Sequence, residues 1–256
     1  GDPENTFVIF DDVKEIYAKR AEELKKIVAE RKAAEAEWRK ANPEKAAQMD
    51  EWFSGKAPKV DWSKVEQKAG SATRAASAAC LGVLAEQVPN MICASDKTDG
   101  FLKKTKSIVR GDFSGAFFQA GVAELTMADM CIGMMLHGGV VAAMGTFFVF
   151  SDYMKPAVRI AALMQVPVKF IWTHDAFRVG EDGPTHEPVE QEAQIRLMEK
   201  LKNHAGKDSV RVFRPADADE TTVCWKLAME NVETPTALIF SRQGIAKLPE
   251  GTDYEQ

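Results

Sequence analysis

Cysteine and histidine are scarce in this sequence, with four of each among 256 residues. The cysteines, Cys80, Cys93, Cys131 and Cys224, lie far apart and form no CxxC pair, which argues against a disulfide framework or a zinc site and is typical of a reducing cytoplasm. The glycine-rich GxGxxG and Walker motifs are missing, so the sequence offers no support for a nucleotide-binding site built on either of them. A GxSxG elbow is missing too, and Cys131 lies in an apolar stretch, which leaves little support for a serine or cysteine nucleophile.

Positive charge is not in excess either. The chain holds 33 Lys and Arg against 38 Asp and Glu, a formal net charge of −5, so it offers no basic surface for nucleic acid and no polybasic membrane signal. Residues 1–4 carry no signal-peptide pattern. The one long apolar stretch, from Cys131 to Phe150, is interrupted by His137 and several glycines, so we expect a buried helix and then a buried strand rather than a membrane span.

The composition that remains, 45% hydrophobic and 28% charged residues, is that of a globular protein with room for one large domain and an appendage. From about Asp11 to Lys56 the sequence is dense in Lys, Glu and Ala, and Ile16 and Leu24 belong to a thin apolar stripe at near-helical spacing. Pro43 predicts a second helix beginning around Glu44. We expect two charged surface helices that lean on a neighbour, with a free-standing helical hairpin as the alternative.

After Gly70 the sequence alternates between helical and apolar strand patterns. The expected helices cover residues 71–87, 122–136, 153–164, 188–202 and 218–231, and the expected strands cover residues 91–94, 140–150, 168–173, 210–213 and 237–241. Such alternation predicts an α/β fold with a mostly parallel sheet and helices on both faces. Ligands bind at the carboxyl ends of strands in sheets of this kind, which directs attention to the loops after 168–173 and 237–241.

Glu124 is the first of three candidate clusters and lies at the start of an otherwise apolar helix. A carboxylate in the first turn of a helix is stabilised by the helix dipole, which accounts for this residue without a function. The alternative is a buried carboxylate that an apolar pocket keeps partly protonated, so that it can hydrogen-bond a cofactor nitrogen.

The second cluster is aromatic. Phe147, Phe150 and Tyr153 are spaced by three, so they share one face if the chain passes from strand into helix there. An aromatic face serves core packing in many proteins, and it also suits the cradling of a flat heteroaromatic ring.

The third cluster is a loop that follows the strand expected over 168–173. It begins with Thr173-His174-Asp175 and reaches His186, so it holds two of the four histidines together with several carboxylates and glycines. Such loops commonly carry function, and histidine is the usual proton-transfer residue. A surface loop with incidental histidines and a His–Asp–His metal site remain as alternatives, although helical ligand spacing is missing.

Together these clusters resemble the pyrimidine-binding domain of the transketolase family over about residues 71–244. The most specific motif is Gly180-Glu181-Asp182-Gly183-Pro184-Thr185-His186-Glu187-Pro188-Val189-Glu190-Gln191, and a second matching run is Thr236-Ala237-Leu238-Ile239-Phe240-Ser241-Arg242-Gln243. Related thiamine enzymes such as deoxyxylulose-phosphate synthase share a shorter part of the first motif. The resemblance implies a thiamine-diphosphate-binding fold over residues 67–256, with residues 1–66 as a helical interdomain linker.

The resemblance also implies roles for individual residues. Glu124 matches the catalytic glutamate that hydrogen-bonds the aminopyrimidine ring of thiamine diphosphate, the cofactor that carries a two-carbon unit between sugars. Phe147, Phe150 and Tyr153 match the pocket for that ring, and Asp96 matches an aspartate lining the channel for cofactor and substrate.

Five further positions match groups that contact the substrate. His174 and His186 correspond to polar groups near the reacting atoms, and Asp182 corresponds to a contact with a substrate hydroxyl. Arg74 and Arg242 match arginines that hold the sugar phosphate, a role for which a bidentate guanidinium is suited.

The sequence departs from the family pattern at three places. Ala123 and Leu125 flank the glutamate where the family often has Arg and His or Phe. Residues 97–100 replace a segment that usually offers a serine for phosphate. Residues 197–208 look like an insertion, for which we expect a surface excursion.

The family's diphosphate-binding domain carries a GDG motif and a later Asn that hold magnesium, and neither this motif nor the smaller C-terminal domain is found in the sequence. We therefore expect this chain to be inactive alone and to work as part of a cytoplasmic homodimeric enzyme of the pentose phosphate pathway, with sugar phosphates as substrates and a diphosphate-binding domain as its partner. The alternatives are a related transferase such as dihydroxyacetone synthase, and a domain for assembly or regulation without catalysis.

Overall fold

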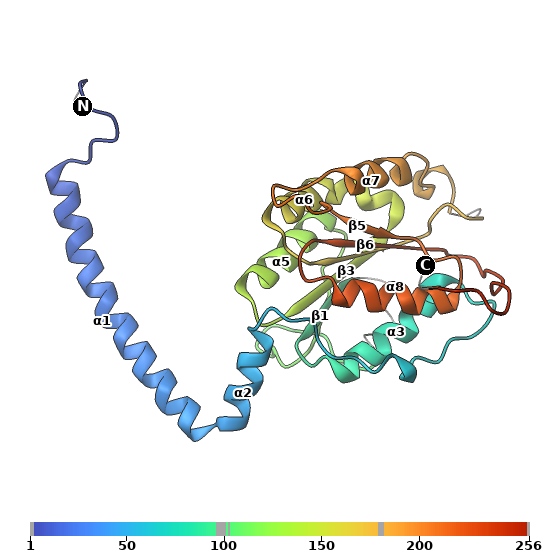
Figure 1. The fold of residues 1–256 in the computed structure, drawn as a ribbon, viewed down its shortest axis with the longest axis horizontal. Coiled ribbons are helices and arrows are strands. Elements are labelled where there is room, and N and C mark those ends of the chain that lie inside the picture. Colours follow the sequence, from blue (N-terminus) through green and yellow to red (C-terminus); the bar gives the residue numbers. More distant parts are fainter. Residues whose placement is uncertain (1–2, 96–100, 102, 179–181, 255–256) are drawn as a thin grey trace. The chain divides into compact units, whose positions relative to one another are not determined.

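The computed structural model of the chain describes residues 3–95, 101, 103–178 and 182–254. It divides into two compact units, residues 1–51 and 52–256 (Figure 1). The boundary expected between linker and domain, after residue 66, falls inside the second unit and stays a prediction.

The first unit is helical, as predicted. Helix α1 spans Asp11–Ala41 and buries none of its described side chains, while α2, Pro43–Trp52, begins on a proline that needs no amide donor there. Acidic residues in the first turn of α1 and basic residues in its last turn match the helix dipole. Exposed ion pairs three and four residues apart also support α1, so local charge patterning rather than burial sustains this long helix.

The second unit is built around one six-stranded sheet in which all strand pairs are parallel, in the order β2-β1-β3-β4-β6-β5. The strands are β1 Met91–Ser95, β2 Phe117–Phe118, β3 Val141–Phe147, β4 Lys169–Thr173, β5 Arg211–Phe213 and β6 Thr236–Phe240. The α-helices are α3 Thr73–Gln87, α5 Glu124–His137, α6 Ser151–Met164, α7 Gln191–Lys200 and α8 Ala218–Glu230, and the short 3-10 turns are η1 Trp62–Lys64, η2 Phe148–Phe150 and η3 Pro184–His186. The predicted α/β class is therefore confirmed.

Helices cover both faces of this sheet because successive strand side chains point to opposite sides. Phe170 and Trp172 of β4 belong to a core shared with α5, α6 and α7, whereas Ile171 between them belongs to a core shared with α3 and α8. Figure 1 shows the same separation, with α5, α6 and α7 on one side of the strands and α3 and α8 on the other. The apolar runs of the sequence are thus strands buried on both faces.

The apolar stretch from Cys131 to Phe150 is the end of α5 followed by β3, as predicted. Over the described residues, none of the helices combines the length and the apolar character needed to cross a bilayer.

Several details differ from the sequence prediction. Strand β3 ends at Phe147 and not at residue 150, because the η2 turn follows it, and α6 begins at Ser151 rather than at residue 153. The short strand β2 was not expected, because only Phe117 and Phe118 pair with β1 and two residues make no periodic pattern. Helix α7 begins at Gln191 rather than near Pro188, since the Gln191 side chain accepts a hydrogen bond from the Val189 amide and the η3 turn occupies the preceding residues.

The expected insertion contains the end of α7 and a tight turn over residues 201–209. Lys202 and Asp208 pair across this turn, and the Asn203 side-chain oxygen accepts from the amides of Ala205 and Lys207. The turn leads from α7 into the amino end of β5, at the edge of the sheet opposite to the carboxyl ends of the strands.

Candidate functional site

The carboxyl ends of three neighbouring strands, β3, β4 and β6, lie level with one another. In the register of the sheet Phe147 pairs with Thr173, and Thr173 pairs with Phe240. The next residues, among them His174 and Ser241, therefore leave the sheet at one edge. Both loops singled out from the sequence meet at this edge.

The three aromatic residues form a row along the end of β3 and the start of α6. The rings of Phe147 and Phe150 are nearly parallel, with centroids 6.0 Å apart and an interplanar angle of 9°, and Phe150 and Tyr153 are also 6.0 Å apart. The row exists because the η2 turn carries the chain from β3 directly into α6, as the spacing of three predicted. It runs from buried Phe147 to Tyr153, which is 60% exposed, so it is an open row rather than an enclosed core.

Both loop histidines lie against this row. The His174 ring stacks on Phe147 with centroids 3.8 Å apart, and the His186 ring meets Phe147 and Phe150 edge-on at 5.6 and 5.2 Å. Each imidazole also lies next to the hydroxyl of the threonine that precedes it, with 2.8 Å between Oγ1 and Nδ1 at Thr173–His174 and at Thr185–His186. Because Nδ1 is engaged in this way in both rings, Nε2 is the nitrogen left to face other groups.

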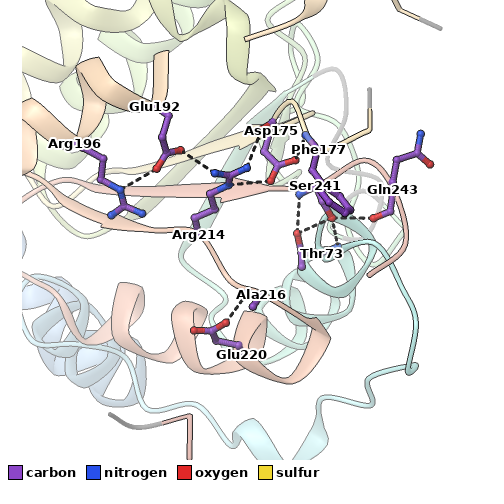
Figure 2. Close-up of polar contacts among 10 residues, drawn as sticks. All are labelled: Thr73, Asp175, Phe177, Glu192, Arg196, Arg214, Ala216, Glu220, Ser241 and Gln243. Carbon is purple, nitrogen blue, oxygen red and sulfur yellow. Dashed lines mark hydrogen bonds and ion pairs between the residues drawn. The ribbon is translucent and has the colours of Figure 1, made fainter. Parts of the chain in front are cut away.

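Asp182 lies between His174 and Arg242. Its Oδ2 lies 4.0 Å from His174 Nε2 and 3.4 Å from Arg242 Nε. Arg74 in turn donates from Nε to the Arg242 carbonyl at 3.4 Å. Thr73 and Ser241 exchange hydrogen bonds that fix the start of α3 to the end of β6 (Figure 2). Since Arg74 and Arg242 are the next residues along the chain, this contact brings them together.

Glu124 is the first residue of α5, so the dipole of that helix favours its carboxylate. It is half-buried, and Thr146 Oγ1, near the end of β3, lies 3.5 Å from its Oε1. Glu124 therefore faces the strand that carries the aromatic row, but its described contact is with Thr146 and not with the rings.

Asp96 and residues 97–100 lie outside the described residues. Among the residues that are described, no group of three or more His, Cys, Asp or Glu is arranged to hold a metal ion. Cys131 is fully buried, and burial raises its pKa to about 12, which excludes a thiolate nucleophile at that position at neutral pH.

Sequence analysis placed Asp175 in the third cluster and Gln191 in the family motif, but it gave neither a supporting role, and it missed Arg214. Asp175 is buried directly after His174, and Arg214, just beyond β5, donates to its carboxylate and its carbonyl (Figure 2). Gln191 is also buried and donates to Asp152 beside the aromatic row. Arg214 also comes directly after a strand, but that position alone does not show that it binds Asp175, which is 39 residues away in the sequence.

Comparison with known proteins shows which family the chain resembles. Residues 69–247 match the family model for the transketolase pyrimidine-binding domain. The transketolase of Halalkalibacterium halodurans is 39% identical over 261 residues, which cover 98% of this chain and 36% of that protein. The chain thus spans a little more than a third of that relative's length.

Solved structures agree. The transketolase from Leishmania mexicana superposes with a TM-score of 0.84 at 32% identity, over 99% of this chain and 38% of that one. A split-gene transketolase, described as an inactive β4 tetramer, gives a TM-score of 0.52 at 25% identity, over 73% of this chain and 55% of that one. These matches favour a transketolase over the alternatives of a dihydroxyacetone synthase or a non-catalytic domain. The chain belongs to the transketolase family, in which it is the pyrimidine-binding domain.

Proposed function

We propose that the complete protein transfers a two-carbon glycolaldehyde unit from ketose phosphates to aldose phosphates with thiamine diphosphate, and that this chain forms the pyrimidine side of the active site. The observation that carries the proposal is the row Phe147–Phe150–Tyr153 with His174 and His186 against it, in a chain that matches the pyrimidine-binding domain over residues 69–247. This reaction belongs to the pentose phosphate pathway.

The residues present suit the pyrimidine end of the cofactor. An open row of aromatic faces is suited to stacking with a flat heteroaromatic ring. Glu124, half-buried at the head of α5, would accept or donate a hydrogen bond at a ring nitrogen, and Asp96 would line the channel beside it. When bound, the cofactor supplies the carbon that attacks the ketose and holds the two-carbon unit.

The remaining residues would handle the sugar. His174 and His186 present Nε2 beside the aromatic row, where they would move protons at the substrate's reacting oxygens. Asp182 would accept a hydrogen bond from a substrate hydroxyl. Arg74 and Arg242, joined at the edge by the Arg242 carbonyl, would hold the phosphate at the far end of the sugar.

The diphosphate end and magnesium would be held by a different domain. Two observations support this: this chain covers only 36% of the Halalkalibacterium halodurans transketolase, and the split-gene transketolase, of which this chain covers 55%, is described as inactive. On this proposal residues 1–66 are the linker to that domain, residues 67–256 are the pyrimidine-binding domain, and two copies of the protein form a homodimer.

Removing the Glu124 carboxylate tests the proposal in the complete protein. Glu124→Ala should abolish transfer from a ketose phosphate to ribose phosphate, because the pyrimidine ring loses its hydrogen-bonding partner. Glu230→Ala is the matched control, since this exposed carboxylate ends α8 at the opposite edge of the sheet and its loss should leave transfer unchanged. Substantial transfer by the Glu124 variant would refute its catalytic role, and a preference of the wild type for formaldehyde as acceptor would point to a dihydroxyacetone synthase.

A further inference from the structure

The backbone directly after β4 adopts an unusual conformation. His174, Ala176 and Arg178 have φ angles of +62°, +72° and +56°, so every second residue of this segment lies in the left-handed region. That region is unfavourable for residues with a Cβ atom and persists only where surrounding contacts hold it. Something must therefore fix the segment that carries His174.

Asp175, between the first two of these residues, is where the segment is held. It is only 7% exposed, and its Oδ1 accepts a hydrogen bond from the Phe177 amide at 3.2 Å. Arg214 donates two hydrogen bonds to Asp175: Nε donates to Oδ2 at 3.0 Å, and Nη2 donates to the backbone carbonyl at 3.1 Å. One guanidinium thus fixes both the Asp175 side chain and the peptide between Asp175 and Ala176, directly after the residue that follows His174.

Arg214 is itself anchored to the body of the domain. It follows β5 by one residue, and its Nη1 lies 3.7 Å from Glu192 Oε2 on α7. Glu192 also pairs with Arg196 at 2.9 Å, and Arg196 donates to the Val212 carbonyl of β5 (Figure 2). A chain of ion pairs therefore links α7 and the end of β5 to Asp175, the residue next to His174.

Two of the described contacts of His174 depend on the direction in which its side chain leaves the backbone. Its ring stacks on Phe147, and its Nε2 faces Asp182 at 4.0 Å. A relaxation of the His174 backbone out of the left-handed region would turn the side chain away from both, because the direction of Cβ changes with φ.

We propose that Arg214 and Asp175 are a positioning pair for His174: the guanidinium holds Asp175, and Asp175 holds the left-handed backbone that aims the imidazole. Neither residue is among those proposed above to contact the substrate. The positioning is a property of this chain, while its consequence for turnover rests on the function proposed above.

Nuclear magnetic resonance of the chain tests the positioning without any activity. With only four histidines, at 137, 174, 186 and 204, the imidazole carbon–proton resonances are few, and His174→Gln assigns the one of interest. Phe147, stacked 3.8 Å from the ring, should give the His174 resonance a ring-current shift. In Arg214→Gln that shift should be lost, while the resonance of His204, in the turn before β5, stays in place.

Arg196→Gln is the matched control. Arg196 has the same 36% side-chain exposure as Arg214 and also pairs with Glu192, but its described contacts do not include Asp175. Its removal should leave the His174 resonance unchanged. If Arg214→Gln unfolds, Arg214→Lys is used instead, because it keeps the charge but cannot make both guanidinium hydrogen bonds. In that variant the ring-current shift of the His174 resonance should be partly lost. An unchanged His174 resonance in the Arg214 variants, or an equal change in Arg196→Gln, would overturn the proposal.

The complete protein provides the kinetic counterpart. Misplacement of an aligned group by about 1 Å can cost roughly 100-fold in rate, so Arg214→Gln should lower kcat by roughly 10- to 100-fold with a smaller change in KM. A wild type without transfer activity would refute the proposed function and leave the resonance result standing. Transfer by the wild type with an unchanged kcat in Arg214→Gln would instead contradict the role of the pair in turnover.

Discussion

Lys169 is a cation buried in the middle of the sheet, at the start of β4. It is 2% exposed, and its Nζ donates to the Asn231 carbonyl at 2.7 Å. Burial, and to a lesser extent the charge of Arg211, lowers its pKa from 10.5 to about 7. The lysine is the first residue of β4 and His174 follows the last, so the length of the strand separates them. Its charge should therefore affect stability and not the site.

The pH dependence of stability follows from this shift. Below about pH 7 both the folded and the unfolded chain hold the Lys169 proton, and the full cost of the buried charge is present. Between about pH 7 and 10.5 the unfolded chain binds more protons, so the contribution of this residue to stability rises with pH. Methionine at this position does not titrate. The free energy of unfolding of the wild type should therefore rise relative to that of Lys169→Met by roughly 1 kcal/mol per pH unit between about pH 7 and 10.5.

Denaturant unfolding of both proteins from pH 6 to 10 measures this difference. Parallel curves over the whole range would contradict the assignment of a lowered pKa to Lys169.

At the scale of single residues, the sequence predicted the groups that stand out by type and position. His174 and His186 could be singled out because histidine is scarce and because both follow a strand end. Lys169 and Arg214 could not, because their importance depends on burial and on partners at Asn231 and Asp175, which are distant in sequence.

Among the elements, the start of α7 deserves a test because one side chain ties it to the aromatic row. Gln191 is 2% exposed, its Nε2 donates to Asp152 Oδ2 at 3.0 Å, and its Oε1 accepts from the Val189 amide at 2.9 Å. Asp152 lies between Phe150 and Tyr153 in the sequence. Gln191 therefore joins the loop that carries His186 to α6, at the end of the aromatic row.

Gln191→Leu should destabilise the domain by about 1 to 3 kcal/mol, because the Val189 amide and the Asp152 carboxylate lose a partner. It should also change the His186 resonance more than that of His174, since the loop it holds is the one after η3. Glu190→Gln, at the exposed neighbouring position, is the control and should change stability little. Unfolding curves that coincide for the two variants would show that the contacts of Gln191 carry no net stability.

Elements were predictable where the pattern was long, and less so where side chains decide. The helices over Thr73–Gln87 and Ala218–Glu230 lie within two residues of their predicted bounds. Strand β2 was missed because its two residues acquire strand character only by pairing with β1. That β4 and β6 are neighbours in the sheet is decided by tertiary packing and could not be predicted from the sequence. The tendency of ligands to bind at the carboxyl ends of parallel strands nevertheless indicated that the loops after both strands share the site.

For the whole molecule, cofactor binding provides the first test. We expect the chain alone to bind thiamine diphosphate weakly or not at all, because the charged end of the cofactor needs magnesium and a second domain, and half a pocket loses most of the binding energy. Titration calorimetry with magnesium present measures this. Micromolar affinity would contradict the division of the site between two domains.

Self-association is the second test at this scale. The neighbouring helices α5 and α6 expose several large apolar side chains, including Leu136 at 51% and Leu163 at 51%. Apolar side chains that gather on an exposed surface commonly mark an interface, so these helices are candidates for one. Leu136→Glu should shift the sedimentation profile toward monomer, whereas Leu197→Glu, on α7 and 62% exposed, should not. A wild type that sediments strictly as a monomer would count against the proposed dimer.

The turn over residues 201–209 has a practical consequence. Its backbone is closed by its own contacts, with Gly206 at a φ of +75° between residues that the Asn203 side chain holds. It connects α7 to the amino end of β5, so the full length of the strands separates it from His174 and Arg242. Added residues in this turn, or a fluorescent label at the exposed Ala205, would therefore report on the domain, or anchor it to a support, without entering the site.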